Sequence, residues 1–543
     1  MKKIVISLLL AVAMLLSLAA CSSANDMGNG DPSAEGILPN KGGMNYDAAM
    51  DAAQDAQQAA ASVQQAAADL ADQLNNAAGE VKVNIYEHPD YGKFVENSCI
   101  KVSEKDVSTF SADVDTASYT YFRKMASQGY SLSELIRYVG QSVRTEEMIN
   151  YFSYDYTAPA SGQLFGVNSV ITDCPWNSEA VLLTLGLRAD DAIPSTGNNL
   201  VFLIDVSGSM RSSDKLELLK TAFGYLTEQL TEKDTVSIVT YSGREAVVLT
   251  GCPGNQSAKI LKAVNNLEAS GSTNGQAGLE KAYSIAADYF IEGGNNRIIM
   301  ASDGDLNVGI SSADELKKFV EQKRDAGIYL SVMGFGTGNY RDANMEALAD
   351  NGNGVYYYID GEAEAEKIFG TDLLGTLYTV AEDVKLQLTF SPEYIDSYRL
   401  VGYENRLLAE EDFDDDTKDA GEVGAGHTVT VCYELKLTDA AKAQLQASSG
   451  AGDEWMKLAV RYKNPGETQS LLNEYSWGRE LYSAPSDDIK FMCAVIETSM
   501  LLHESKNLGG IELDDIIEQL DGLDLSGDRY KKEFKEILIS LDQ

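Results

Sequence analysis

The pattern of apolar and polar positions separates a region of continuous apolar runs from a region of strict alternation. Between about residues 198 and 381, apolar runs alternate with stretches whose apolar residues recur at helical spacing. Continuous runs are typical of strands buried on both faces, and their alternation with helices predicts a doubly wound, mainly parallel sheet. The runs are Leu200–Ile204, Val236–Tyr241, Arg297–Ser302, Ile328–Phe335 and Val355–Ile359.

The period changes to two after this α/β region. Apolar and polar residues alternate in three further segments, Val384–Phe390, Thr428–Leu437 and Met456–Tyr462. Alternation predicts half-exposed antiparallel strands, hence a β-sandwich. Because Gln163–Arg188 also has strand patterning, we expect the α/β unit to be inserted in one sandwich built from residues 160–190 and 383–475.

Oxygen-bearing side chains follow the first apolar run directly. Asp205, Ser207 and Ser209 occupy alternating positions in a loop that leaves the carboxyl end of the strand, where open α/β sheets place their ligands. Hard oxygen donors favour Mg²⁺ or Mn²⁺ over Zn²⁺. The alternative is that these residues cap helix starts, a common role for Asp and Ser, but one loop does not need three caps.

Two later loops complete a known pattern. Thr273 lies in the stretch GSTN, and Asp303 follows another buried-strand run. With the D-x-S-x-S motif, they resemble the metal-ion-dependent adhesion site of von Willebrand factor type A (vWA) domains. The resemblance implies one Mg²⁺ or Mn²⁺, held by the hydroxyls of Ser207, Ser209 and Thr273, with Asp205 and Asp303 acting directly or through water.

The resemblance also implies a function in binding. Such a site is one ligand short, so an exposed Asp or Glu of a protein partner can complete the coordination of the ion. An alternative is an envelope scaffold or assembly factor whose metal site is structural. Enzymatic activity and a small-molecule substrate are not expected, because the chain has three histidines and lacks G-x-S-x-G, H-E-x-x-H and P-loop motifs.

The regions flanking the α/β unit have distinctive amino-acid sequences. The stretches STFSADVDTASYTYFRKMASQGY and VRTEEMINYFSYDY before it, and Tyr398–Arg406 and Thr417–Glu422 after it, resemble the flanks of bacterial vWA lipoproteins of the YfbK kind. Asp113 to Thr116 could suggest a second metal loop. The helical pattern that follows predicts instead that Asp115 and Thr116 cap a helix.

The amino terminus predicts export and lipidation. Met1-Lys2-Lys3 precedes an apolar core from Ile4 to Leu16, as in a signal peptide, and the next residues, Leu18-Ala19-Ala20-Cys21, resemble a lipobox. We expect Cys21 to carry the lipid and to hold the protein at the extracytoplasmic face of the cell membrane. An ordinary signal peptide with a chance cysteine is the alternative. No other run approaches the roughly 20 apolar residues of a membrane-spanning helix.

Seven segments are therefore expected. They are a lipoprotein signal peptide (1–20), a flexible tether (21–43), an Ala/Gln-rich helical stalk (44–80), an N-terminal vWA-flanking domain (95–190), the vWA domain (195–382), a β-sandwich C-terminal flank (383–475) and a C-terminal helical segment (476–543).

Composition narrows the range of partners. The chain has 83 acidic and 43 basic residues and a net charge of −40, which excludes nucleic acid as a partner. Six cysteines occur, and the five other than Cys21 are scattered and odd in number, so we expect buried thiols rather than disulfides or a zinc site.

An acidic segment, Asp412 to Asp419, resembles the opening of an EF-hand loop. Its sixth position is Thr417 rather than Gly, and its twelfth is Val423 rather than Glu. The segment is therefore predicted to be a solvated acidic loop.

Overall fold

The computed structural model describes residues 94–112, 114–192, 196–271, 275–304, 313–336, 342–446 and 453–542. They belong to one compact unit, Asn84–Gln543. The predicted tether and stalk, together with Cys21, Asp113 and Thr273, lie outside the described residues. Within the described part, no helix combines the length and apolar character that crossing a membrane would require.

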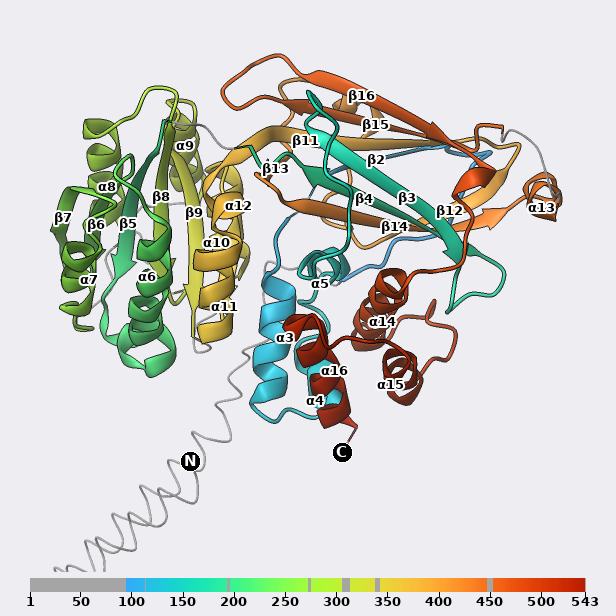
Figure 1. Cartoon of the computed structure of the whole chain (residues 1–543), viewed down its shortest axis with the longest axis horizontal. Helices are drawn as coiled ribbons and strands as arrows, with labels where there is room; N and C mark the ends of the chain where they lie inside the picture. The colour runs from blue at the N-terminus through green and yellow to red at the C-terminus, as the bar shows by residue number, and fades with distance from the viewer. Residues whose placement is uncertain are drawn as a thin grey trace, which may run out of the picture. The chain divides into compact units, whose positions relative to one another are not determined.

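A six-stranded sheet forms the centre of the α/β region (Figure 1). All neighbouring strands are parallel except for the edge pair β6–β7. The order is β10-β9-β8-β5-β6-β7, with bounds β5 (Asn198–Asp205), β6 (Thr235–Tyr241), β7 (Glu245–Pro253), β8 (Asn295–Ser302), β9 (Tyr329–Phe335) and β10 (Tyr356–Ile359).

Helices cover both faces of this sheet. Leu200, Phe202 and Ile204 of β5 share a core with α6, α7, α11 and α12, while Val201 and Leu203 share another with α8, α9 and α10. Both faces of the central strand are thus buried, which confirms the predicted doubly wound fold. The helices are α6 (Leu218–Gln229), α7 (Ser257–Asn265), α8 (Gln276–Asp288), α9 (Ala313–Arg324), α10 (Asp342–Asn351), α11 (Glu362–Glu366) and α12 (Leu373–Leu377).

Two antiparallel sheets form the sandwich. The first has the order β1-β12-β14-β4-β3, and in the second β13-β11-β15-β16 is joined by β2, which pairs with β11. Their bounds are β1 (Ile100–Lys101), β2 (Val107–Ser111), β3 (Phe165–Asp173), β4 (Val181–Ala189), β11 (Thr379–Phe390), β12 (Ile395–Val401), β13 (Gly421–Gly424), β14 (Thr428–Leu437), β15 (Met456–Lys463) and β16 (Leu471–Trp477). Because β4 precedes the α/β region and its neighbour β14 follows it, the α/β unit is inserted in the sandwich.

A layer of helices covers the outer face of the first sheet. Leu182 of β4 and Cys432 of β14 share a core with residues of α5 and α14. The layer is close enough that a Cβ on Gly186 would lie 2.2 Å from the ring of Tyr156. The helices outside the α/β region are α3 (Ala117–Ser127), α4 (Leu132–Tyr138), α5 (Thr145–Asn150), α13 (Asp439–Gln446), α14 (Asp487–Leu502), α15 (Leu513–Asp521) and α16 (Arg529–Leu541).

This layer overturns one expectation from the alternating pattern. Strand β14 was expected to be half-exposed, but Thr430 and Cys432 on its polar face are fully buried. The helices remove these side chains from solvent, and Thr430 compensates by bonding with the hydroxyl of Tyr156.

Two local expectations are also wrong. Thr116 is the N-cap residue of α3 but makes no side-chain capping bond. The N–H of Ser118 in the first turn is bound instead by the carboxylate of Glu147. Asp115 accepts a hydrogen bond from the Tyr356 backbone and pairs with Arg406. Four of the five cysteines are buried as expected, whereas Cys99 is exposed.

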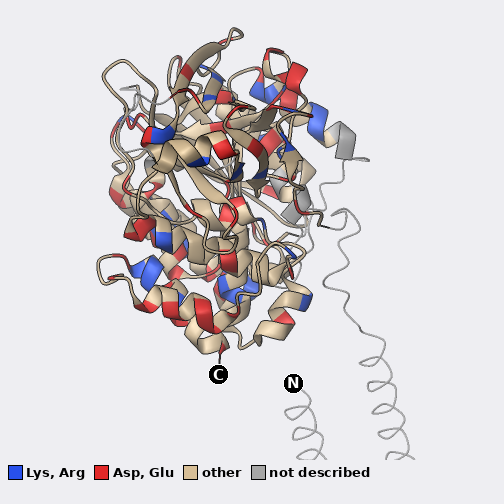
Figure 2. Ribbon diagram, turned by 90° about the vertical axis from the view of Figure 1, so that its right-hand side faces the viewer, with Lys and Arg blue, Asp and Glu red and all other residues tan. Residues whose placement is uncertain are grey.

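Acidic and basic residues are interspersed on one side of the described part of the molecule. Asp and Glu are spread over helices and loops on the side of the molecule in Figure 2, with Lys and Arg between them.

Candidate metal centre

Asp205 lies at the carboxyl end of the central strand. It is the last residue of β5 and fully buried, and its Oδ1 accepts a hydrogen bond of 2.7 Å from the backbone N–H of Ser207. The hydroxyls of Ser207 and Ser209 lie 2.8 Å apart. A single 3₁₀ turn, Gly208–Arg211, follows. The loop therefore gathers one carboxylate and two hydroxyls at one point.

Backbone hydrogen bonds join this loop to the loop that precedes α8. Ser270 donates to the Val206 carbonyl at 2.7 Å, and Gly208 donates to the Gly271 carbonyl at 3.0 Å. Thr273, the predicted ligand from that second loop, lies outside the described residues. The described residues Ser270 and Gly271 of the second loop are therefore hydrogen-bonded to the loop that carries Ser207 and Ser209.

Asp303 comes from the neighbouring parallel strand. It follows Ser302, the last residue of β8, and β8 pairs with β5 so that Ala301 lies opposite Ile204. Asp205 and Asp303 consequently share the same edge of the sheet, and Asp303 is 3% exposed. The structure thus places four of the five predicted ligands, Asp205, Ser207, Ser209 and Asp303, on loops at one edge.

The two carboxylates carry unsatisfied oxygens. In the described part of the chain, Asp205 Oδ2 and Asp303 Oδ1 are buried and have no hydrogen-bond partner. Burial raises the pKa of Asp205 to about 6, and the nearby charge of Asp303 raises it further. Ser207 and the hydroxyl of Tyr241 act in the opposite direction and lower it. Buried carboxylate oxygens beside hydroxyl donors fit a hard divalent cation, which removes the cost of the unpaired charge.

Lys215 is a member of this centre that the sequence interpretation did not single out. Its Nζ lies 2.8 Å from Asp303 Oδ2 and 3.0 Å from the Ser209 carbonyl oxygen. The stem passes Gly336, where φ is +76° and an added Cβ would lie 2.1 Å from Lys215 Cε. A lysine in the first turn after the loop was the available signal, because helical side chains point back toward the amino end.

The N-terminal flank also reaches this edge of the sheet. Lys124 of α3 donates to the carbonyl of Asp360, which follows β10, and its Nζ lies 3.7 Å from a carboxylate oxygen of Asp214, five residues beyond Ser209. Arg123 binds the side chains of Asp360 and Glu364. The helix α3 is therefore a neighbour of the metal loops.

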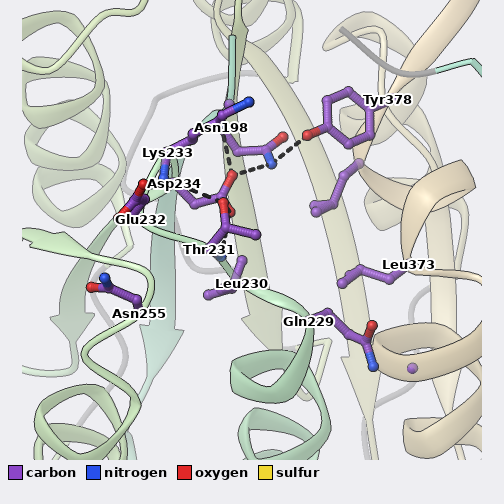
Figure 3. A pocket seen from close by; sticks show the side chains of 13 residues that line it. Asn198, Gln229, Leu230, Thr231, Glu232, Lys233, Asp234, Asn255, Leu373 and Tyr378 are labelled. Carbon is purple, nitrogen blue, oxygen red and sulfur yellow. Dashed lines mark hydrogen bonds between the residues drawn. The ribbon is translucent and has the colours of Figure 1, made fainter. Parts of the chain in front are cut away.

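A separate cavity of about 690 Å³ lies at the amino end of β5 (Figure 3). Its wall contains a hydrogen-bonded group, Asn198, Asp234 and Tyr378, and the leucines Leu230 and Leu373. Because Asn198 begins β5 and Asp205 ends it, this cavity and the metal loops lie at opposite ends of the strand. The cavity does not contribute to the metal centre.

Three protein families match the chain. The von Willebrand factor type A domain matches residues 199–371, a family described as von Willebrand factor matches residues 85–184, and the C-terminal domain of the uncharacterized protein YfbK matches residues 375–543. The vWA match covers the six-stranded sheet, and the YfbK match covers the sandwich strands after it and the last helices.

Individual proteins are similar to the chain over different shares of its length. The chain is 38% identical over 472 residues to the uncharacterized protein YfbK of Escherichia coli (strain K12), covering 82% of this chain and 80% of that protein. It is 28% identical to human inter-alpha-trypsin inhibitor heavy chain H3 over 47% of this chain and 30% of that protein. A solved von Willebrand factor type A structure from Catenulispora acidiphila is 17% identical, with a TM-score of 0.37, over 64% of this chain and 80% of that one.

The bacterial relative covers 82% of the chain, and the matches to the vWA and YfbK C-terminal domains cover residues 199–371 and 375–543. This chain belongs to the YfbK family of vWA-domain proteins.

Proposed function

We propose that this protein binds a protein partner through a divalent cation held by Asp205, Ser207, Ser209, Thr273 and Asp303. The observation that carries the proposal is the pair of buried carboxylate oxygens, Asp205 Oδ2 and Asp303 Oδ1, that have no partner among the described residues. The cation, Mg²⁺ or Mn²⁺, supplies a coordination position that an acidic side chain of the partner can occupy. vWA domains mediate protein–protein interaction, which supports this role.

Residues of the chain prepare the site for that task. The Ser207 N–H holds one oxygen of Asp205, and the Lys215 ammonium holds one oxygen of Asp303. Each carboxylate therefore has a fixed orientation and one remaining oxygen. Because Lys215 also neutralises part of the local charge, a bound ion stays electrophilic toward an incoming carboxylate.

A structural role of the metal is the second candidate. Lys215 already compensates one of the two buried charges, so an ion that compensates the other would stabilise the fold without any partner. In that case the protein would act as an envelope scaffold or assembly factor. The two candidates differ in whether a partner depends on the ion.

Metal binding is tested first, with the full mature chain in detergent. Titration with Mn²⁺, followed by paramagnetic relaxation of water, should show saturable binding that Mg²⁺ displaces. The Asp205→Ala, Asp303→Ala double variant should lose it, whereas Asp288→Ala, an exposed carboxylate on α8, should retain it. Unchanged binding in the double variant would show that the ion is held elsewhere.

The partner is tested by capture from membranes with Mg²⁺ or with a chelator. A protein retained by the wild type with Mg²⁺, and lost with chelator or in the double variant, supports adhesion or another binding role. A partner retained under all three conditions supports the scaffold alternative.

We also propose that a lipid on Cys21 anchors the protein at the extracytoplasmic face of the cell membrane. The lipobox-like residues Leu18 to Cys21 support this proposal. A palmitate analogue should label the wild type and not Cys21→Ser, which should leave the membrane fraction. A labelled, membrane-held Cys21→Ser protein would place the anchor at another residue.

A further inference from the structure

A second group of carboxylates lies where the chain passes from the α/β unit into the sandwich. It consists of Asp383 of β11, Asp419 of the following acidic loop and Glu422 of β13. One oxygen of each lies within 4.8 Å of the others. Oxygens that share one Ca²⁺ at 2.3–2.6 Å are separated by at most roughly 5 Å, so this spacing suits a common ion.

Glu422 has an unsatisfied carboxylate inside this group. Its side chain is 7% exposed, and Oε1 has no hydrogen-bond partner among the described residues. Burial raises its pKa well above the usual range, and the charges of Asp419, Asp383 and Asp350 raise it further. A buried carboxylate surrounded by other carboxylates requires either a proton or a cation.

Ion pairs occupy two members of the group and a neighbouring carboxylate. Lys463 pairs with Asp383 at 2.5 Å, and Arg324 of α9 pairs with Asp419 at 3.4 Å. Asp350 at the end of α10 pairs with Arg406 at 3.4 Å. None of these ion pairs involves Glu422, whose charge interacts with the buried guanidinium of Arg297 without forming an ion pair among the described residues.

A cavity beside the group provides room for an ion. It has a volume of about 200 Å³, and its wall includes Asp350, Asp419 and Glu422. A water molecule takes about 30 Å³ in the liquid, so the space admits an ion with several waters. Asp383, the third member of the group, lies at a β-bulge, where its φ is 51°.

We propose that Asp383, Asp419 and Glu422 form a calcium site, separate from the metal centre at Asp205. All available ligand atoms are hard oxygens, which favour Ca²⁺ over transition metals. The irregular set of three carboxylates from a bulge, a loop and a strand end suits Ca²⁺, which accepts variable geometry, better than Mg²⁺, which demands an octahedron.

The site would act on the junction between the two parts of the fold. Strands β11 and β13 are paired next to the point where the chain leaves α12 (Figure 1). The Arg324–Asp419 pair connects the same loop to α9 of the α/β unit. A bound Ca²⁺ would therefore fix the exit of the inserted unit against the sandwich.

The test uses the full mature chain carrying Asp205→Ala and Asp303→Ala, so that the first metal centre is removed. Calorimetric titration with Ca²⁺ should show one saturable site, and Ca²⁺ should raise the melting temperature. Adding Glu422→Gln or Asp419→Asn should weaken binding by about tenfold or more, because affinity follows the number of charged ligands. The matched control, Glu411→Gln, changes an exposed carboxylate of the same loop and should bind within about twofold of its parent.

The outcomes separate this site from a protonated Glu422. If the parent shows no saturable Ca²⁺ binding, the proposal is overturned. It is also overturned if Glu422→Gln raises the melting temperature while leaving the calcium isotherm unchanged. Should Glu422→Gln fail to fold, the exposed Asp419 gives the same comparison through Asp419→Asn.

Discussion

Asn198 and Tyr378 are hydrogen-bonded to each other at the two ends of the inserted α/β unit. Asn198 Nδ2 donates to the Tyr378 hydroxyl at 2.6 Å, and both the backbone and side-chain N–H groups of Asn198 donate to Asp234 (Figure 3). Asn198 begins β5, and Tyr378 directly precedes β11. The entry and the exit of the unit are thus adjacent, which allows the insertion with short connections.

Removing this bond should loosen the base of the unit. Tyr378→Phe leaves one buried N–H of Asn198 without its acceptor, so we expect a loss of about 1 kcal/mol in the free energy of unfolding. Urea denaturation followed by circular dichroism measures it. Tyr225→Phe, which removes an exposed hydroxyl that donates to Glu362, should change the free energy by less than about 0.5 kcal/mol. Equal losses in the two variants would contradict a special role for the Asn198–Tyr378 bond.

The pattern of apolar residues predicted the strands better than it predicted their surroundings. The run around Val201 and Leu203 gave a central strand buried on both faces, because each face of a doubly wound sheet is covered by the helices next in sequence. The alternation in β14 wrongly predicted exposure of Thr430 and Cys432. Their cover comes from α5 and α14, which are remote in sequence, so the local pattern holds no information about it.

Some residues of the candidate sites could be predicted from the sequence, and others could not. Asp205, Ser207 and Asp303 could be predicted because the carboxyl ends of neighbouring parallel strands meet at one edge. The place of Lys215 in the first turn after the Asp205 loop was a signal, but its pairing with Asp303 depends on the fold. Glu422 could not be predicted, since the fold brings Asp383 to it from another segment. An acidic loop without an EF-hand pattern gave no sign that one of its aspartates faces a buried glutamate.

The Lys215–Asp303 pair should couple stability to metal binding. Lys215→Met leaves the buried Asp303 without its counter-charge, so the metal-free protein should lose about 3–5 kcal/mol. Mg²⁺ can replace the missing positive charge and should raise the melting temperature of the variant more than that of the wild type. Melting curves with a chelator and with Mg²⁺ measure both effects.

Lys233→Met, which removes an exposed lysine of the same domain, is the control and should respond to Mg²⁺ as the wild type does. If Mg²⁺ shifts the melting temperature of Lys215→Met no more than that of the control, Lys215 does not act at the metal centre.

Arg123 should be essential for holding α3 against the α/β unit. Its guanidinium binds Asp360 through two nitrogens, Glu364 at 2.8 Å and the Tyr151 hydroxyl at 2.6 Å, with a side chain 7% exposed. Arg123→Ala should cost about 3–5 kcal/mol in the free energy of unfolding, because two buried carboxylates lose their counter-charge. Arg123→Lys keeps the charge but not the planar fork and should give an intermediate loss.

Chemical denaturation measures these losses, with Arg137→Ala as the exposed control on α4. The control should change stability by less than about 0.5 kcal/mol. A loss for Arg123→Lys as small as that of the control would mean that the bidentate geometry does not matter.

Glu497 should make stability fall as the pH rises toward neutrality. It is fully buried in α14, and burial raises the pKa of its carboxyl to about 7, against the opposing hydrogen bond from Gln519. The folded protein therefore holds the proton more tightly than the unfolded chain, whose ordinary value is 4.5. The stabilisation is complete below pH 4.5 and is lost as the pH rises through 7, by about 3 kcal/mol for the whole window.

The amide in Glu497→Gln cannot ionise, so the variant should escape this loss. We subtract the free energy of unfolding of the wild type from that of the variant at each pH. This difference should be larger at pH 8 than at pH 4.5, by up to about 3 kcal/mol. Comparing the two proteins at each pH cancels the titration of all other groups. Glu518→Gln, on the exposed side of α15, should give the same difference at both pH values. If the curves for Glu497→Gln and the wild type run parallel, Glu497 is ionised in the folded protein. Another group then compensates its Oε1, which has no hydrogen-bond partner among the described residues.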